Sequence, residues 1–315
     1  MKKLFALALI VAVISCQEEI TPIVELNNQN PGGNPGENPD EEPDPEDCEL
    51  AVLTPVAGKY ANCIPLLSTS TFDIVTWNIE QFPKQGSGTI SLLAEIIPTL
   101  NADIIAVQEI GNATNFNLLV AALPGWAGVV STTGSIKTGY LYKTSEVTVS
   151  AVTYPLVDAS AFPRSPMFIT ATHTPSGQEV VLINLHLKCC DDDDSIPRRK
   201  SASTKLKTYI DANLSNKAVV MLGDYNEDIT QPEGNDVFTN FVNDAANYRF
   251  ADMMIAECSS ANWSYPSWPS QLDHMLITNE LFSKVKDIRV LRLNECEGSY
   301  YNTISDHRPV LMQLQ

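Results

Sequence analysis

Short hydrophobic runs recur along the chain after residue 70 and predict buried β-strands. They are three to five residues long, often β-branched and bounded by turn residues, which is typical of strands buried on both faces. The runs cover 72–76, 104–107, 180–183, 218–222 and 275–277. Apolar residues at helical spacing lie between them, at 91–100, 116–123, 198–214 and 236–243. Strands that alternate with helices in this way predict an α/β layered domain.

Polar clusters lie beside these runs and contain residue types that bind metals and move protons. They include Asn78 and Glu80, Gln108 and Glu109, Asn184 and His186, Asp224 and Asn226, Asp273, and Asp306 with His307. Side chains at the ends of such strands would open onto one rim, where a rigid sheet fixes their positions. Carboxylate and amide oxygens suit a hard cation such as Mg²⁺ or Mn²⁺. Cysteine is absent from the clusters, which argues against zinc.

The residue types predict metal-assisted hydrolysis of a phosphoester. A phosphodiester resists attack because its anionic oxygens repel nucleophiles, so a cation must neutralise charge while a base deprotonates water. An imidazole whose tautomer is fixed by a carboxylate serves as that base near neutral pH. The clusters contain both carboxylates and imidazoles.

The order of the clusters, from about Thr71 to Gln315, resembles the endonuclease/exonuclease/phosphatase superfamily. The resemblance implies a four-layer α/β sandwich, in which two mixed β-sheets pack face to face with helices outside. It implies that Asn78, Glu109 and Asp306 serve as metal ligands. Mg²⁺ is the expected ion, with Mn²⁺ or Ca²⁺ as alternatives.

The same resemblance implies roles for the remaining polar residues. His307 corresponds to the general base and Asp273 to the carboxylate that orients it. Asp224 and Asn226, with Asp306, correspond to a group that handles the phosphate, the attacking water or a second cation. His186 corresponds to a residue at the scissile phosphate or leaving oxygen. Arg164, within 162–166, corresponds to an arginine that contacts substrate phosphate.

One departure from the family pattern concerns His186. Deoxyribonuclease I-like members have a glutamate just before the strand that resembles 140–143, and this glutamate partners the histidine. The stretch 135–139 of this chain contains no acid. His186 is therefore interpreted as a phosphate ligand or as an acid with another partner, and its presence argues against an abasic-site repair enzyme.

The N-terminus resembles that of an exported bacterial lipoprotein. Lys2 and Lys3 precede an apolar run over 4–14, and 13–16 resembles a lipobox that ends in Cys16. The run is too short to span a bilayer comfortably. The predicted organisation is a signal peptide at 1–15, a lipidated acidic Pro/Gly/Asn-rich tether at 16–49, a lead-in at 50–70 and a catalytic domain at 71–315. The expected location is extracytoplasmic, anchored by Cys16 to the bacterial outer membrane, with surface exposure left open.

The charge is strongly acidic and unevenly distributed. Of the net −18, residues 17–49 contribute 11 acids and no Lys or Arg, whereas 50–315 contain 27 acids and 18 bases, a net −9. An acidic catalytic domain argues against tight, sequence-independent binding of duplex nucleic acid. It leaves room for a transient substrate held by a metal and a few arginines.

The cysteines predict disulfides in the exported protein. Without Cys16, six of the seven cysteines remain, and six allow 15 pairings. We expect Cys48 to pair with Cys63 and Cys258 with Cys296, while the adjacent pair at 189–190 either bonds internally or stays reduced. A separate expectation concerns His173, which lies in a predicted hairpin turn and should face solvent.

We expect a divalent-metal-dependent phosphodiesterase that acts as an extracytoplasmic nuclease, because 77–82 is more similar to secreted nucleases than to sphingomyelinases. Its expected partners are nucleic acid and, through Cys16, a membrane; the protein is expected to be a monomer. The alternative is a phosphatase, or a sphingomyelinase or phospholipase-type hydrolase, acting on inositol phosphates or lipid head groups. A second alternative is a non-catalytic surface-binding lipoprotein, which would be expected to have lost some metal or base residues.

Overall fold

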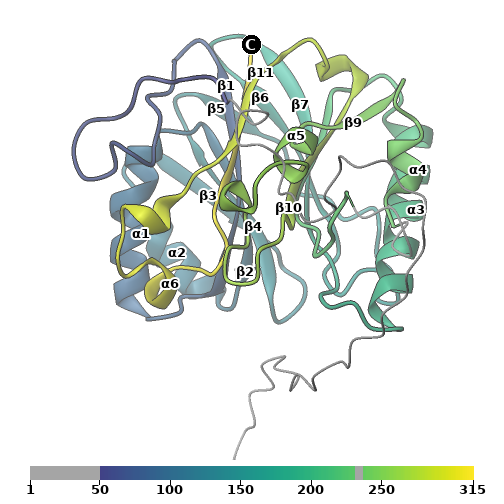
Figure 1. Ribbon diagram of the computed structural model, residues 1–315, viewed down its shortest axis with the longest axis horizontal. Coiled ribbons are helices and arrows are strands. Elements are labelled where there is room, and N and C mark those ends of the chain that lie inside the picture. The colour runs from purple at the N-terminus through teal and green to yellow at the C-terminus, as the bar shows by residue number, and fades with distance from the viewer. Residues whose placement is uncertain (1–49, 231–236) are drawn as a thin grey trace, which may run out of the picture. The chain divides into compact units, whose positions relative to one another are not determined.

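Two six-stranded mixed β-sheets form the centre of the computed structural model, which describes residues 50–230 and 237–315 (Figure 1). The strand orders are β11-β12-β1-β2-β4-β3 and β5-β6-β7-β8-β10-β9. The first sheet comprises β1 (Phe72–Phe82), β2 (Ile104–Ile110), β3 (Trp126–Val130), β4 (Lys137–Lys143), β11 (Val285–Val290) and β12 (Val310–Leu314). The second comprises β5 (Val147–Val149), β6 (Met167–His173), β7 (Gln178–His186), β8 (Val219–Asp224), β9 (Tyr248–Phe250) and β10 (Asp273–Thr278).

Helices cover the outer faces of the two sheets. In Figure 1, α1 and α2 lie on one side of the sandwich and α3 and α4 on the other. The helices are α1 (Ser87–Leu100), α2 (Ala113–Ala121), α3 (Ser195–Asn213), α4 (Thr239–Val242), α5 (Met253–Ala256) and α6 (Tyr300–Thr303). Short 3₁₀ turns are η2 (Ser260–Asn262), η3 (Asn279–Leu281) and η4 (Leu293–Glu295). The predicted four-layer α/β sandwich is confirmed, although α4 is shorter than the helix expected at 236–243.

Three apolar layers hold the sandwich together. The central layer, between the sheets, contains Ile74, Ile104, Leu182, Val220 and Met275. The outer layers lie between the first sheet and α1 with α2, and between the second sheet and α3. The central strands are therefore buried on both faces, which explains why they are continuous apolar runs in the sequence rather than alternating ones.

Strand direction brings the polar ends to one rim. In each sheet one central pair is parallel, β1 with β2 and β7 with β8, and a helix connects the two strands of each pair. β12 runs antiparallel to β1 and β10 antiparallel to β8. Residues at the start of β10 and just before β12 therefore lie beside the ends of the parallel strands. Asp224, for example, is in register with both His186 and Asp273.

A buried amide pair bridges the two sheets below this rim. Gln108 of β2 donates from Nε2 to the side-chain oxygen of Asn184 on β7 at 2.8 Å. Asn184 in turn donates to the backbone oxygens of Val107 and Gly139, at 3.2 and 2.8 Å. Buried amides require partners of this kind, so the pair fixes the relative position of the sheets next to the rim.

His173 does not face solvent as expected. It is 1 % exposed, stacks on Phe72 with ring centroids 5.0 Å apart, and its Nδ1 lies 2.8 Å from the hydroxyl of Ser176. The prediction was wrong because the turn end of the β6–β7 hairpin packs against the start of β1 in the other sheet. This packing is a long-range contact that the local turn sequence does not reveal.

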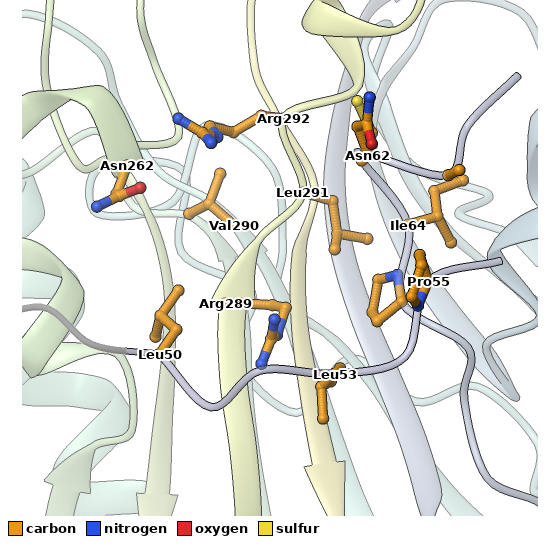
Figure 2. Close-up of a pocket in the computed structure, with 13 residues that line it drawn as sticks. Leu50, Leu53, Pro55, Asn62, Ile64, Asn262, Arg289, Val290, Leu291 and Arg292 are labelled. Atoms are coloured by element: carbon orange, nitrogen blue, oxygen red, sulfur yellow. The ribbon is translucent and has the colours of Figure 1, made fainter.

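The lead-in segment lies along the β11 edge of the first sheet. Figure 2 shows Leu50, Leu53 and Pro55 beside Arg289 and the residues that follow it. Arg289 donates from its guanidinium to the backbone oxygen of Ala51 at 2.8 Å. A pocket of about 200 Å³ remains between this segment and the sheet edge.

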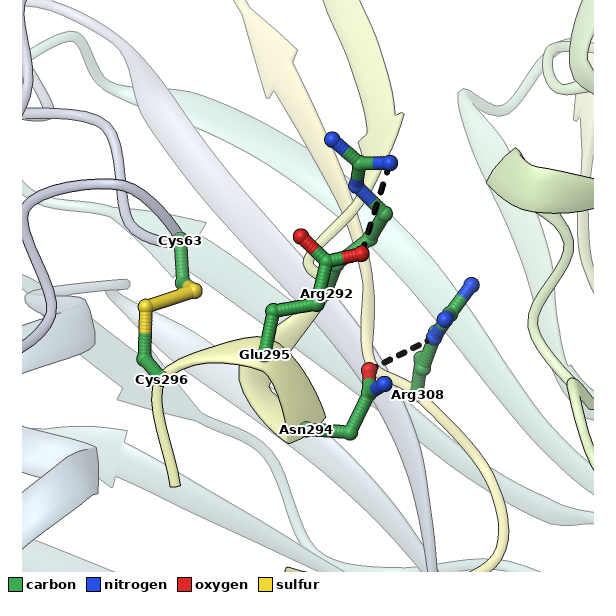
Figure 3. The surroundings of a disulfide bond; sticks show 6 residues. All are labelled: Cys63, Arg292, Asn294, Glu295, Cys296 and Arg308. Atoms are coloured by element: carbon green, nitrogen blue, oxygen red, sulfur yellow. Dashed lines mark hydrogen bonds and ion pairs between the residues drawn. A yellow bond between two sulfur atoms is a disulfide. The ribbon is translucent and has the colours of Figure 1, made fainter. Parts of the chain in front are cut away.

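A disulfide ties the lead-in to the C-terminal part of the domain (Figure 3). Cys63 is bonded to Cys296, which follows η4, across 233 residues of sequence. The expected pairs, Cys48 with Cys63 and Cys258 with Cys296, are therefore wrong. No local pattern indicates that 50–65 folds back onto the segment that leads to His307. The sulfur atoms of Cys189 and Cys190 lie 3.1 Å apart, the distance of a thiol–thiol hydrogen bond.

The predicted signal peptide, lipidated Cys16 and tether lie outside the described residues. Within 50–230 and 237–315, no helix has the length and apolar character needed to cross a membrane.

We predict that the Cys63–Cys296 bond contributes strongly to stability. The double variant Cys63→Ala/Cys296→Ala should unfold with a free energy lower by roughly 2–5 kcal/mol, because the bond closes a long loop in the unfolded chain. Denaturant unfolding with and without reductant measures the effect. Cys189→Ala is the control and should unfold like the wild type; an equal loss in both variants would contradict the prediction.

Candidate active site

Carboxylates from the two sheets converge on a single amide at the rim. Asn78, which is buried on β1, donates from Nδ2 to Glu109 Oε1 at 3.2 Å and to Asp224 Oδ2 at 2.8 Å. Glu109 belongs to β2 of the first sheet, and Asp224 ends β8 of the second. This arrangement places two acids from different sheets around one point.

The chain adopts unusual backbone conformations where it delivers these groups. Glu80, Gln81, Glu109 and Asn226 have φ values of 26°, 46°, 62° and 50°, in the left-handed region that non-glycine residues rarely adopt. The amide of Gln81 donates to Glu109 Oε2 at 2.9 Å, which helps to hold that carboxylate. Such conformations persist when the surroundings stabilise them, and they cluster at functional sites.

Gly223 allows β7 and β8 to approach closely beside the site. Its φ is 142°, and a Cβ atom added there would lie 2.1 Å from the backbone oxygen of Leu185. A side chain at this position would push apart the strands that carry His186 and Asp224. The glycine before Asp224 therefore sets the spacing of the rim.

His307 and Asp273 form a buried imidazole–carboxylate pair. His307 Nδ1 lies 2.6 Å from Asp273 Oδ2, and the backbone amide of Asp273 donates to the hydroxyl of Ser264 at 3.0 Å. Burial lowers the pKa of His307, but the negative charges of Asp273 and Asp224 outweigh burial and raise this pKa to about 10. In the absence of a cation, the carboxylates therefore favour the protonated imidazole.

His186 lies on the other side of Asp224 and has a different electrostatic environment. Its Nε2 is 3.6 Å from Asp224 Oδ2 and 3.8 Å from Glu109 Oε1. Burial, with the nearby charges of Arg164 and His307, holds its pKa well below the ordinary value. Its Nδ1 is buried, and no group among the described residues hydrogen-bonds to it. These surroundings favour the neutral form of the ring, and no carboxylate among the described residues holds its Nδ1.

The remaining predicted residues lie around this centre. Arg164 Nη1 and Asn226 Nδ2 each donate to the backbone oxygen of Leu187 at 3.4 Å. Asp306 Oδ1 lies 3.9 Å from His307 Nε2, on the imidazole side of the site. The structure thus gathers the predicted side chains of the catalytic domain at one rim, while Cys16 lies outside the described residues.

Donor atoms at the centre fit a divalent cation. One donor atom each from Glu109, His186 and Asp224 lies within 4.8 Å of the others. Burial raises the pKa of Asp224 to about 7, and the charges of Asp273 and Glu109 add to this effect. Like charges held together in this way are stabilised by a bound cation. Asn78 directs its amide nitrogen toward the acids, so ligation through its oxygen would require the amide to turn over.

A second group of donors, Asp224, Asp273 and His307, also lies within 4.8 Å. The short hydrogen bond between Asp273 and His307 already occupies one nitrogen of the ring. That arrangement suits proton transfer better than metal ligation, because the carboxylate fixes which ring nitrogen faces the centre.

Two further residues contact the site although the sequence analysis assigned them no catalytic or metal-binding role. Glu80 accepts a hydrogen bond from the backbone amide of Asp306 at 3.0 Å and pairs with Lys84. The ring of Tyr265 packs on the ring of His307, with centroids 4.8 Å apart. Glu80 lies two positions after Asn78, and this period-two spacing could have indicated that both point to one face. Tyr265 lies in a loop whose fold the sequence does not specify.

The chain is similar to known proteins in its sequence pattern and in its fold. The sequence model of the Endonuclease/Exonuclease/phosphatase family matches residues 75–307. No curated protein matches the chain by sequence. Many solved structures are similar in fold, and their low sequence identities limit the likeness to the fold itself.

Three of these structures illustrate the range. TDP2 of D. rerio, in complex with single-strand DNA product, is 13 % identical with a TM-score of 0.63, over 78 % of this chain and 99 % of that one. An endonuclease/exonuclease/phosphatase of Bacteroides vulgatus is 15 % identical with a TM-score of 0.60, over 78 % and 98 %. The mannosyl-6-phosphatase of Bacteroides thetaiotaomicron is 15 % identical with a TM-score of 0.57, over 78 % and 99 %.

The His307–Asp273 geometry predicts a specific pH dependence of activity. A base must be deprotonated to accept a proton. Because the pKa of His307 is raised, the acid limb of the rate profile, where activity falls as the pH falls, should lie above the ordinary histidine pKa of about 6.5. A cation that neutralises Asp224 should move this limb back toward lower pH. His307→Ala should remove the limb and lower turnover by about two to four powers of ten, with little effect on substrate affinity.

The control for this prediction is the double variant. Asp273→Asn should lower turnover by no more than His307→Ala does. The double variant should be no slower than the slower single variant, because the two residues act as a unit. Steady-state rates from pH 5 to 10 test both statements. An acid limb that survives His307→Ala, or losses that multiply independently, would show that another group is the base.

Proposed function

Because the chain belongs to the Endonuclease/Exonuclease/phosphatase family, whose members are phosphoester hydrolases, we propose that it is a metal-dependent phosphodiesterase that cleaves nucleic acid outside the cytoplasm. The observation that carries the proposal is the convergence of Glu109 and Asp224 on Asn78, beside the His307–Asp273 pair. Carboxylates that can hold a cation therefore lie next to an oriented base, which is the combination that phosphoester hydrolysis requires.

Mg²⁺ is the proposed cofactor, with Mn²⁺ or Ca²⁺ as alternatives. Glu109 and Asp224 supply carboxylate oxygens, Asp306 supplies a further carboxylate on the imidazole side of the rim, and Asn78 would supply its oxygen only after its amide turned over. A bound divalent ion would polarise the phosphoryl oxygen and neutralise its charge. The oxygen-rich donor set favours a hard cation over zinc.

The side chains of this protein have distinct proposed tasks. His307 Nε2 accepts a proton from water as the water oxygen attacks phosphorus, and Asp273 stabilises the resulting imidazolium. The bond from phosphorus to the leaving oxygen breaks in the same step, and the leaving oxygen takes up a proton from solvent. Arg164 and Asn226 hold the phosphate oxygens in a fixed orientation. His186 is neutral, so it can donate a hydrogen bond to the scissile phosphate or leaving oxygen without adding charge.

Nucleic acid is the proposed substrate on two grounds. One is the fold similarity to a TDP2 structure that contains single-strand DNA product. The other is the likeness of 77–82 to secreted nucleases. The net charge of −9 over 50–315 is consistent with a substrate that is held transiently at the metal and a few arginines, rather than along an extended basic surface.

A phosphatase that acts on a phosphorylated sugar or lipid head group is the second candidate. The fold similarity to the mannosyl-6-phosphatase of Bacteroides thetaiotaomicron favours it, and an acidic domain is compatible with a small substrate. The non-catalytic alternative is not proposed, because the metal-binding and base residues are all present and converge.

The location is proposed from the N-terminal sequence. The lipobox-like 13–16 supports an outer-membrane lipoprotein. The acidic Pro/Gly-rich stretch that follows it would be the tether that holds the catalytic domain outside the cytoplasm. The Cys63–Cys296 disulfide is consistent with folding in an oxidising compartment.

A substrate panel tests the function directly. Purified protein with Mg²⁺, Mn²⁺ or Ca²⁺ should cleave single-strand or double-strand DNA or RNA faster than sugar phosphates, inositol phosphates or sphingomyelin. Glu109→Gln should retain the fold but lose most activity, because one charge is removed from the metal ligands. Preferential release of inorganic phosphate from small monoesters would favour the second candidate. Activity that survives both chelator and Glu109→Gln would contradict the metal mechanism.

Membrane attachment gives a separate prediction. Cys16→Ser should abolish lipidation and release the protein from the membrane fraction, because stable anchoring requires more than one acyl chain. Detergent partitioning and mass spectrometry of the N-terminal peptide measure the change. The control is Cys189→Ser, which should partition like the wild type; a Cys16→Ser protein that remains in the membrane fraction would refute the anchor.

A further inference from the structure

A buried guanidinium joins two loops that carry site residues. Arg199, on α3, is 0 % exposed and makes polar contacts through each of its three nitrogens. Its Nε donates to Glu227 Oε2 at 2.6 Å. Its Nη1 donates to the backbone oxygens of Lys188 and Cys190, at 3.0 and 2.5 Å, and its Nη2 to Asp191 at 2.9 Å. One side chain therefore holds the loop after β7 against the loop after β8.

Both loops continue directly into the active site. The loop after β7 begins at Leu187, whose backbone oxygen accepts hydrogen bonds from Arg164 and Asn226. The loop after β8 contains Asn226, with its left-handed backbone, and then Glu227. A shift of Arg199 would therefore move the groups that contact Leu187 as well as the residue next to Asn226.

Glu227 extends this connection to the strand that carries Asp273. Its backbone oxygen lies 2.9 Å from His274 Nε2, and His274 Nδ1 lies 2.6 Å from Asp252 Oδ2. These three residues are at most 2 % exposed. One connected set of contacts thus joins Arg199, Glu227, His274 and Asp252. It links the loops after β7 and β8 to β10, and all three strands carry site residues.

We propose that Arg199 and Glu227 are positioning residues that set the spacing of His186, Asn226 and Asp273 for catalysis. The proposal rests on the proposed phosphodiesterase function. An ion pair that served stability alone would be replaceable by apolar residues of similar volume, since such replacements are often neutral or stabilising. A guanidinium that orients two loops cannot be replaced in this way. Apolar side chains donate no hydrogen bonds, so they cannot hold the backbone carbonyl groups of the loops in place.

The test compares two matched apolar replacements. Arg199→Met/Glu227→Leu removes the proposed positioning pair. Arg289→Met/Asp287→Leu removes a comparable pair on β11, where Arg289 contacts both carboxylate oxygens of Asp287 at 2.5 and 2.7 Å. We expect both variants to fold. The first should have a kcat lowered roughly 10- to 100-fold, whereas kcat of the second should be unchanged, and KM should change little in either variant. Equal kcat losses in the two variants, or a folded first variant with wild-type kcat, would overturn the proposal.

Histidine NMR gives a readout that does not depend on activity. The chain has four histidines, and the ring signals of His186 and His274 should shift in the Arg199/Glu227 variant while that of His173, at the opposite end of the sandwich, should not. A wild type that hydrolyses no phosphoester would refute the proposed function, yet these signals would still decide the positioning role. Unmoved His186 and His274 signals would overturn it.

A milder pair of variants applies if the double replacement does not fold. Glu227→Gln keeps the size of the side chain, and Asp191→Asn changes a group whose side chain is 80 % exposed but contacts the same guanidinium. Both should lower kcat in the same direction, by less than the double replacement, with melting temperatures close to that of the wild type. Wild-type kcat and histidine signals in both would count against the proposal.

Discussion

Two carboxylates from different sheets accept hydrogen bonds from one amide. The site depends on this constraint, because it holds two groups of like charge close together. Glu109 and Asp224 both accept hydrogen bonds from Asn78, and burial with the neighbouring acids raises the pKa of Asp224 to about 7. Two ionised acids this close repel each other unless a positive charge lies between them. A divalent cation would supply that charge, and the same ion would neutralise the substrate phosphate during hydrolysis.

The fold keeps these acids together by stabilising the rim from below and from the sides. The Gln108–Asn184 amide pair joins the sheets beneath it, and the hydroxyl of Ser305 donates to the backbone oxygen of Asn78 at 2.6 Å. Left-handed backbone at a non-glycine residue costs on the order of 1–3 kcal/mol. The apolar layers on both faces of the sheets offset such costs, which explains why a strained, acidic rim can exist on a stable sandwich.

Much of this arrangement was predictable because its signals are local. Continuous β-branched runs identified the central strands, and polar residues beside them identified Asn78, Glu109, His186, Asp224 and His307 as neighbours at strand ends. The chemistry of acids, amides and imidazoles then indicated a hard cation and a base. The period of a strand and the rule that strand ends share a rim place these residues together, whereas the role of each residue was implied by the resemblance to the family.

Features that depend on long-range packing were missed or predicted wrongly. The disulfide pairing failed because the lead-in folds onto η4, and His173 is buried because its hairpin meets the other sheet. Tyr265 packs on His307 from an irregular loop, and the role of Arg199 depends on four contacts with residues from two loops. Neither spacing nor composition contains these contacts, because they arise only when the sheets and helices pack.

The proposed mechanism requires that Glu109 and Asp224 together bind the divalent cation. Crystals soaked in Mn²⁺ and measured at its absorption edge test this most directly. An anomalous peak is expected between the two carboxylates, and it should be absent in Glu109→Gln crystals treated in the same way. A peak only elsewhere on the protein, or none at a Mn²⁺ concentration that supports full activity, would contradict it.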